Sequence, residues 1–141
     1  MHISSGKPSG ARRFAHTLYL AVAGLILIGI VSEGLLIGPS LFAGTTWGRA
    51  IHGHLAGLLL LLTLLLPVVG RFSRLPGRMI LLSVVLFVLT LSEAILAVLG
   101  RRAAVPAALH PATALLMSGL TVMLLLQGWR LLRERSAHLK F

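Results

Sequence analysis

Four long runs of apolar residues limit how this chain can fold. Each run holds about 21–23 residues, and a helix of about 20 residues spans the roughly 30 Å hydrocarbon core of a bilayer. The chain is 57% hydrophobic and only 11% charged, whereas the surface of a soluble domain of this size requires more polar side chains. The sequence therefore predicts an all-α integral membrane protein, a bundle of four transmembrane helices at about residues 16–38, 50–70, 79–99 and 107–129.

Polar tails flank this predicted transmembrane domain of residues 16–130. Residues 1–15 are predicted to form a cytoplasmic polar tail, disordered over residues 1–13, and residues 131–141 a basic cytoplasmic tail. The first apolar run is too long for the core of a signal peptide, and no convincing small-x-small cleavage site accompanies it. We therefore interpret this run as a helix of the cell-membrane protein.

Basic residues outside the apolar runs predict the orientation of the helices. Ten of them fall on the side shared by both termini, and three fall on the other side. Because cytoplasmic segments carry an excess of lysine and arginine, both termini are predicted to be cytoplasmic. The ten are Lys7, Arg12, Arg13, Arg71, Arg74, Arg78, Arg130, Arg133, Arg135 and Lys140, and the three are Arg49, Arg101 and Arg102.

Charge and composition exclude several classes of function. The net charge of +10 does not indicate nucleic-acid binding, because the basic residues flank membrane spans and no aromatic-rich basic surface accompanies them. The absence of cysteine excludes disulfides, thiolate metal sites, iron–sulfur clusters and covalently attached c-type heme. The chain also lacks a phosphate-binding loop, a nucleophile elbow and a catalytic triad. No enzymatic activity is therefore predicted for the chain on its own.

Similar motifs recur in the two halves of the chain. Ser32-Glu33-Gly34-Leu35-Leu36 is echoed by Ser92-Glu93-Ala94-Ile95-Leu96, and Ala50-Ile51-His52 by Ala108-Leu109-His110. Further matches follow each histidine at offsets of four, seven and eleven, which trace one face of a helix. The pattern predicts two repeated helical hairpins related by an axis along the membrane normal. The matched pairs are Ala56 and Ala114, Leu59 and Met117, Thr63 and Thr121, and, at an offset of eighteen, Gly70 and Gly128.

The repeat places His52 and His110 at one depth near the outer surface, facing each other across the bundle. One imidazole from each of two facing helices can supply both axial ligands of a heme iron. Ala56 and Ala114, one turn further on, leave space for a flat macrocycle. We therefore predict that the chain binds heme b with His52 and His110 as the iron ligands. The alternative is that both histidines are hydrated at the membrane interface and bind no metal.

Three arginines lie at the histidine end, against the positive-inside pattern. Arg49 precedes the second helix, and Arg101 and Arg102 precede the fourth. Arginine pairs well with carboxylates, so heme propionates at this end would account for the three charges. His54 lies two residues from His52 and points to nearly the opposite face, which makes it the alternative ligand. The remaining histidines, His2, His16 and His138, are interpreted as solvated.

Glu33 and Glu93 lie about one turn inside the outer ends of the first and third helices. A carboxylate in the membrane has to be protonated, paired or hydrated. Such a group can relay protons, bind a metal, or hydrogen-bond the second nitrogen of a histidine. The Glu-x-x-His spacing of di-iron bundles is missing, which disfavours a di-iron or zinc site. A hydrogen bond between helices, to Ser32, Ser92 or a threonine, is an equally good interpretation.

The histidine motifs resemble those of the heme A synthase family. They are Ile51-His52-Gly53-His54-Leu55-Ala56 and Ala108-Leu109-His110-Pro111, each heading a leucine-rich helix. The resemblance covers about residues 16–130 and corresponds to one four-helix half of that family. Small uncharacterised four-helix membrane proteins with a Leu-His-Pro at the fourth helix share the layout. The resemblance implies that His52 and His110 are axial heme ligands, while Arg49 stands where the family has its catalytic glutamate, so heme A synthesis is not implied.

Three functions fit these residues. The first is a b-type heme protein in electron transfer or redox sensing, alone or as a subunit of a larger membrane complex. The second is a cofactor-free structural or assembly subunit that packs through small residues. The third is a small proton-coupled transporter or channel that uses Glu33 and Glu93. The predicted partners are the lipid bilayer and a membrane protein complex or a homodimer.

Overall fold

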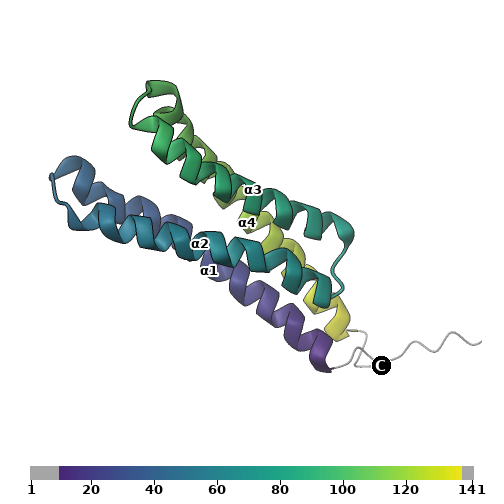
Figure 1. The fold of residues 1–141 in the computed structure, drawn as a ribbon. Helices are drawn as coiled ribbons and strands as arrows, with labels where there is room; N and C mark the ends of the chain where they lie inside the picture. The colour runs from purple at the N-terminus through teal and green to yellow at the C-terminus, as the bar shows by residue number, and fades with distance from the viewer. Residues whose placement is uncertain (1–9, 138–141) are drawn as a thin grey trace, which may run out of the picture.

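The computed structural model describes residues 10–137, and these residues form four helices (Figure 1). Each helix is long and apolar enough to cross a membrane, which confirms the prediction of four apolar helices. The predictions for His2, Lys7, His138 and Lys140 lie outside the described residues. The helices are α1 (Gly10–Phe42), α2 (Trp47–Phe72), α3 (Gly77–Gly100) and α4 (Ala104–Ala137).

The helices extend past the apolar runs at every end. Helix α1 begins at Gly10 and continues through Pro39 to Phe42, and α4 continues to Ala137. The predicted polar tails therefore overlap helical residues at both ends of the chain. Hydropathy detects the part of a helix that faces hydrocarbon, whereas arginine is itself a good helix former and lets a helix continue into the interface.

The four helices contact one another in a ring. Helix α1 packs against α2 and α4, and α3 packs against the same two neighbours. Helices α2 and α4 therefore stand on one diagonal of the ring. The hairpins α1–α2 and α3–α4 diverge toward their connecting loops (Figure 1), so the bundle is closed at the end where α1 begins and α4 stops, and open at the other.

The hydrophobic core occupies the closed half of the bundle. Its most buried side chains come from all four helices, and leucines and valines on the opposite faces are exposed, as expected for helices surrounded by lipid. Toward the loops at residues 43–46 and 101–103, few side chains are buried. The largest fully buried apolar side chains are those of Tyr19, Ile26, Leu66, Met79, Leu86 and Leu124.

His16 is buried at the closed end, so the interpretation of this histidine as solvated is wrong. Its Nε2 donates to the carbonyl oxygen of Gly128 at 2.9 Å, and its Nδ1 lies 3.3 Å from the guanidinium of Arg135. Arg135 also donates to the carbonyl oxygens of Ser73 and Arg74. The cluster joins α1, α4 and the α2–α3 loop, and it forms because α4 continues as a helix far enough to bring Arg135 over His16.

Candidate functional site

His52 and His110 lie where the two hairpins diverge. Their rings come from the diagonal helices α2 and α4, with centroids 6.2 Å apart and planes inclined by 69°. The helical phase explains this direction. Seven and eleven residues after each histidine stand buried core residues, Leu59 and Thr63 on α2 and Met117 and Thr121 on α4. The face of each helix that builds the core below therefore carries the histidine above.

Each histidine is paired with a glutamate of its own hairpin. The Nδ1 atom of His52 lies against Oε2 of Glu33 on α1, and the Nδ1 atom of His110 lies against Oε2 of Glu93 on α3. All four side chains are half-buried. Each glutamate was expected to contact a histidine ring or to hydrogen-bond a residue such as Ser32 or Ser92. In the structure each glutamate contacts the histidine ring. Four ionisable side chains, one from each helix, thus gather at one level of the bundle.

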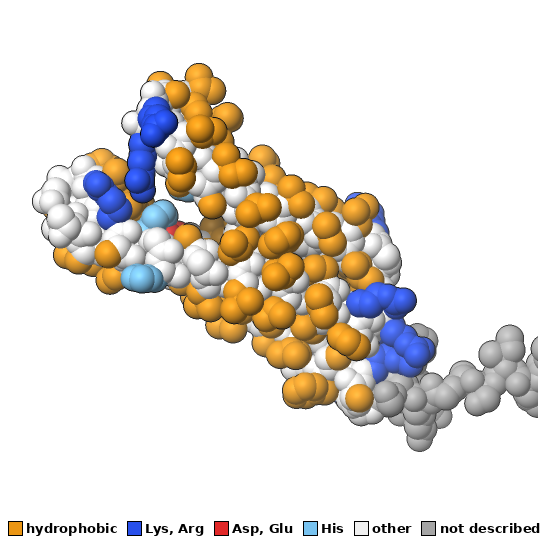
Figure 2. All heavy atoms as spheres, in the orientation of Figure 1, with side chains coloured by type: hydrophobic (Ala, Val, Ile, Leu, Met, Phe, Trp, Pro, Cys, Tyr) orange, Lys and Arg blue, Asp and Glu red, His pale blue; other side chains and the backbone are white. Residues whose placement is uncertain are grey.

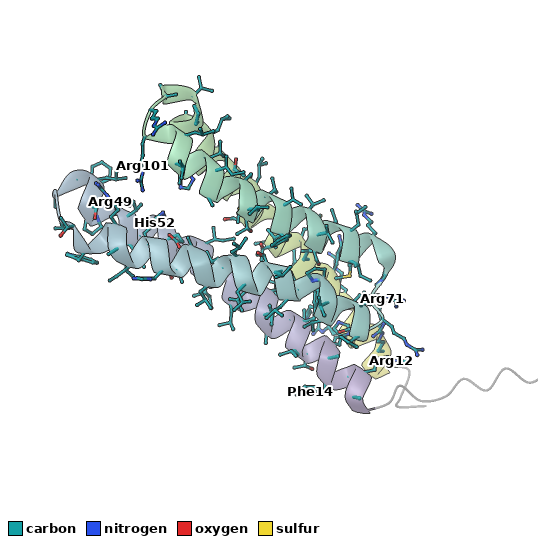
Figure 3. All side chains as sticks on the ribbon, in the orientation of Figure 1. Arg12, Phe14, Arg49, His52, Arg71 and Arg101 are labelled. Carbon is teal, nitrogen blue, oxygen red and sulfur yellow. The ribbon has the colours of Figure 1, made fainter. Side chains whose placement is uncertain are left out.

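The cleft between the hairpins is open to the surface. The space-filling view shows a gap between the two diverging ends, with basic side chains on both and with histidine and acidic side chains inside it (Figure 2). Figure 3 shows Arg49 on the α1–α2 side and Arg101 on the α3–α4 side of this gap, with His52 further in. The site is therefore accessible from the loop end, whereas the closed end is filled by the core.

Three arginines at this end expose their guanidinium groups. Arg49, Arg101 and Arg102 are exposed, and within residues 10–137 the contacts between basic and acidic side chains are the two between histidine and glutamate. The three positive charges therefore have no carboxylate partner in the described part of the chain. Together they make the mouth of the cleft suitable for an anionic ligand.

The other predicted site residues lie around this centre. His54 is exposed and lies on nearly the opposite face of α2 from His52, because two residues along a helix turn a side chain by roughly 200°. Ala56 is exposed and Ala114 is half-buried. Both are small, so they leave the space between the hairpins unfilled one turn below the histidines.

The donor set does not suit a zinc or di-iron centre. Among the described residues, no group of three or more His, Cys, Asp or Glu side chains is arranged to hold a metal ion. Structural and catalytic zinc sites need at least three protein ligands, and di-iron bundles need more. A metal bound here would be held by the two imidazoles and by donors that the protein does not supply.

Contacts between the end of α1 and the start of α2 position Arg49 and, one helical turn further along α2, His52. The backbone N–H of Arg49 donates to Ser40 Oγ at 3.0 Å. Gly48 is buried, and a Cβ there would collide with the carbonyl oxygen of Leu36 and lie 2.8 Å from Ser40 Oγ. The close approach of the two helices therefore requires glycine. The sequence predicts a loop at Ser40 and Gly48, and the spacing of these two residues gives no sign that they bring α1 and α2 together.

Comparison of this chain with protein-family models, with curated proteins and with solved structures finds no match. A functional interpretation therefore depends on the geometry at the open end of the bundle.

Proposed function

We propose that the chain is a membrane protein that binds heme b between His52 and His110 and serves in electron transfer or redox sensing. One observation carries the proposal: two imidazoles from diagonal helices stand with centroids 6.2 Å apart. A metal ion bonded to a nitrogen of each imidazole at about 2 Å separates the ring centres by roughly 6 Å. The spacing thus suits one iron held between the two rings.

The glutamates support the same assignment. A carboxylate that accepts a hydrogen bond from Nδ1 fixes the tautomer of the ring and leaves the Nε2 lone pair for a metal. Glu33 and Glu93 occupy this position beside His52 and His110. We infer that the two carboxylates orient the rings and raise their basicity, as carboxylates do beside metal-binding histidines.

The remaining residues of the cleft match the other parts of a porphyrin. Arg49, Arg101 and Arg102 offer free guanidinium groups for the propionates. Ala56 and Ala114 leave room between the hairpins, and below them the core begins with the buried Leu59 and Met117. When bound, heme would supply one-electron redox chemistry, and the protein would bind the ring, hold the imidazoles and exclude water from its inner edge.

The duplication of the hairpin is part of the proposal. The buried residues of α1 and α3 match at a constant interval of 60 positions, and Glu93 follows Glu33 by the same interval. The matching buried pairs are Tyr19 and Met79, Ala23 and Ser83, Ile26 and Leu86, and Ile30 and Thr90. Between α2 and α4 the matching residues are separated by 58 positions: His110 follows His52 by this interval, and the buried residues below the two histidines match in the same way. This common register supports two copies of one hairpin, each bringing one histidine and one glutamate.

The basic residues support an orientation with both termini in the cytoplasm. In the described part of the chain, eight arginines lie at the closed end of the bundle and three lie at the open end, and cytoplasmic segments carry the excess of basic residues. The heme would then lie near the outer face of the membrane, where it could exchange electrons with a partner on that side.

Removing the carboxylates tests the proposal. We expect the Glu33→Gln and Glu93→Gln variants to bind heme roughly 10- to 100-fold more weakly than the unmodified chain, because loss of such partners weakens metal binding by this order. Hemin titration of purified apoprotein, followed by absorbance, measures the dissociation constant. Glu134→Gln is the matched control, because Glu134 is exposed at the closed end. Equal affinities for all three variants and the unmodified chain would argue against a role of the glutamates at a heme.

A further inference from the structure

An apolar groove runs along the outside of the contact between α1 and α4, in the closed half of the bundle. Its volume is about 480 Å³. The one hydroxyl in its wall, that of Thr17, donates to the carbonyl oxygen of Arg13 at 3.2 Å. The wall includes Thr17, Leu20 and Ala21 of α1 and Leu125, Leu126 and Trp129 of α4.

Helices α1 and α4 are in close contact beneath the groove. A Cβ at Gly128 would lie 2.8 Å from Cδ2 of Leu20, so the glycine lets α1 and α4 approach closely beneath the groove. The backbone oxygen of the same Gly128 accepts the hydrogen bond from the buried His16. These contacts join α1 and α4 directly beneath the groove.

Two exposed arginines stand where the groove reaches the closed end of the bundle. Arg13 lies four residues before Thr17 on α1, and Arg133 lies four residues after Trp129 on α4. Residues four apart share a helix face, and α1 begins at the end where α4 stops. The two arginines therefore flank the opening from opposite sides. The Arg133 guanidinium lies 6.0 Å from the centroid of the Trp129 ring, and tryptophan is typical of the membrane interface.

We propose that this groove binds one anionic phospholipid, with an acyl chain along the apolar wall and its phosphate between Arg13 and Arg133. The charge of the opening selects this occupant. A zwitterionic lipid could fill the same wall, but its neutral head group gains less from two arginines. A partner helix would have to bury both arginine side chains at its end. The groove lies at the opposite end of the bundle from the histidine cleft, so the proposal does not depend on heme.

Brominated lipids provide the test, because bromine quenches tryptophan fluorescence at short range. The chain has two tryptophans, so Trp47→Phe leaves Trp129 as the reporter. We expect brominated phosphatidylglycerol, in phosphatidylcholine vesicles, to quench Trp129 at a mole fraction roughly tenfold lower than brominated phosphatidylcholine. The combined Arg13→Gln and Arg133→Gln substitutions should remove this preference, whereas Arg71→Gln with Arg78→Gln, on the same side of the membrane, should keep it.

Filling the groove gives a second test that leaves the arginines in place. Ala21 lines the groove, and we expect Ala21→Phe to weaken quenching by brominated phosphatidylglycerol, while Val88→Phe on an exposed face of α3 leaves it unchanged. Equal quenching by the two lipids in the Trp47→Phe chain, or a preference retained after both arginines are replaced, would overturn the proposal. So would an Ala21→Phe variant that changes the oligomeric state but not the quenching, because the occupant would then be a second copy of the chain.

Discussion

Replacing either His52 or His110 with alanine is expected to remove heme from the protein. Each substitution leaves one imidazole where two stand with ring centroids 6.2 Å apart, and it removes the ring that the partner glutamate contacts. We expect the amount of heme that copurifies with each chain to fall at least roughly tenfold. Pyridine hemochromogen absorbance, divided by the protein concentration, measures this ratio.

His54→Ala is the matched control, because His54 lies on the same helix, two residues away, and is exposed. It should retain the heme content of the unmodified chain. Added imidazole should restore a bis-nitrogen spectrum to His110→Ala, since a free ligand can occupy the space of the lost ring, whereas a purely structural defect would not be rescued in this way. Loss of heme in His54→Ala together with retention in His52→Ala would contradict the assignment of His52 as the ligand on α2.

Gly48→Ala is expected to destabilise the bundle by about 1–3 kcal/mol, the usual cost of overpacking. The added methyl group would collide with the carbonyl oxygen of Leu36 and press on Ser40 Oγ, so the hydrogen bond from the Arg49 backbone to Ser40 would be strained or lost. The free energy of unfolding in mixed micelles, measured by titration with SDS and followed by circular dichroism, gives the magnitude. Heme affinity should fall as well, because the turn positions the start of α2.

Gly53→Ala provides the control for this substitution. Gly53 lies on the same helix, and a Cβ there would meet open space. Alanine is a better helix former than glycine by about 1 kcal/mol, so Gly53→Ala should be neutral or stabilising. A Gly48→Ala protein as stable as Gly53→Ala would show that the α1–α2 turn can relax without cost.

The sequence was sufficient to predict the helices but not their ends. Runs of about 20 apolar residues indicate membrane spans, because only a helix satisfies its own backbone in lipid. Hydropathy reports contact with lipid, however, and not where the backbone stops being helical. Arg135 illustrates the limit. From the sequence it is one of ten basic residues that orient the chain, whereas in the structure it contacts His16, 119 positions away.

The site could be predicted as a set of residues but not as a set of contacts. Matched motifs placed His52 and His110 at one depth, and the structure brings their rings together. The sequence did not determine which residue each glutamate contacts. Helical periodicity predicts the face of the helix on which a residue lies, but not which neighbouring helix that face contacts. The opening of the cleft was also beyond prediction, since the divergence of two hairpins depends on packing between residues far apart in the chain.

A reduced-minus-oxidised absorption spectrum of the protein, purified from cells with adequate heme, tests heme binding most directly. We expect a Soret band in the oxidised protein and, after reduction with dithionite, a sharp alpha band typical of low-spin heme b with two nitrogen ligands. Colourless protein that also takes up no added hemin would contradict the assignment of His52 and His110 as heme ligands, and would favour a cofactor-free assembly subunit.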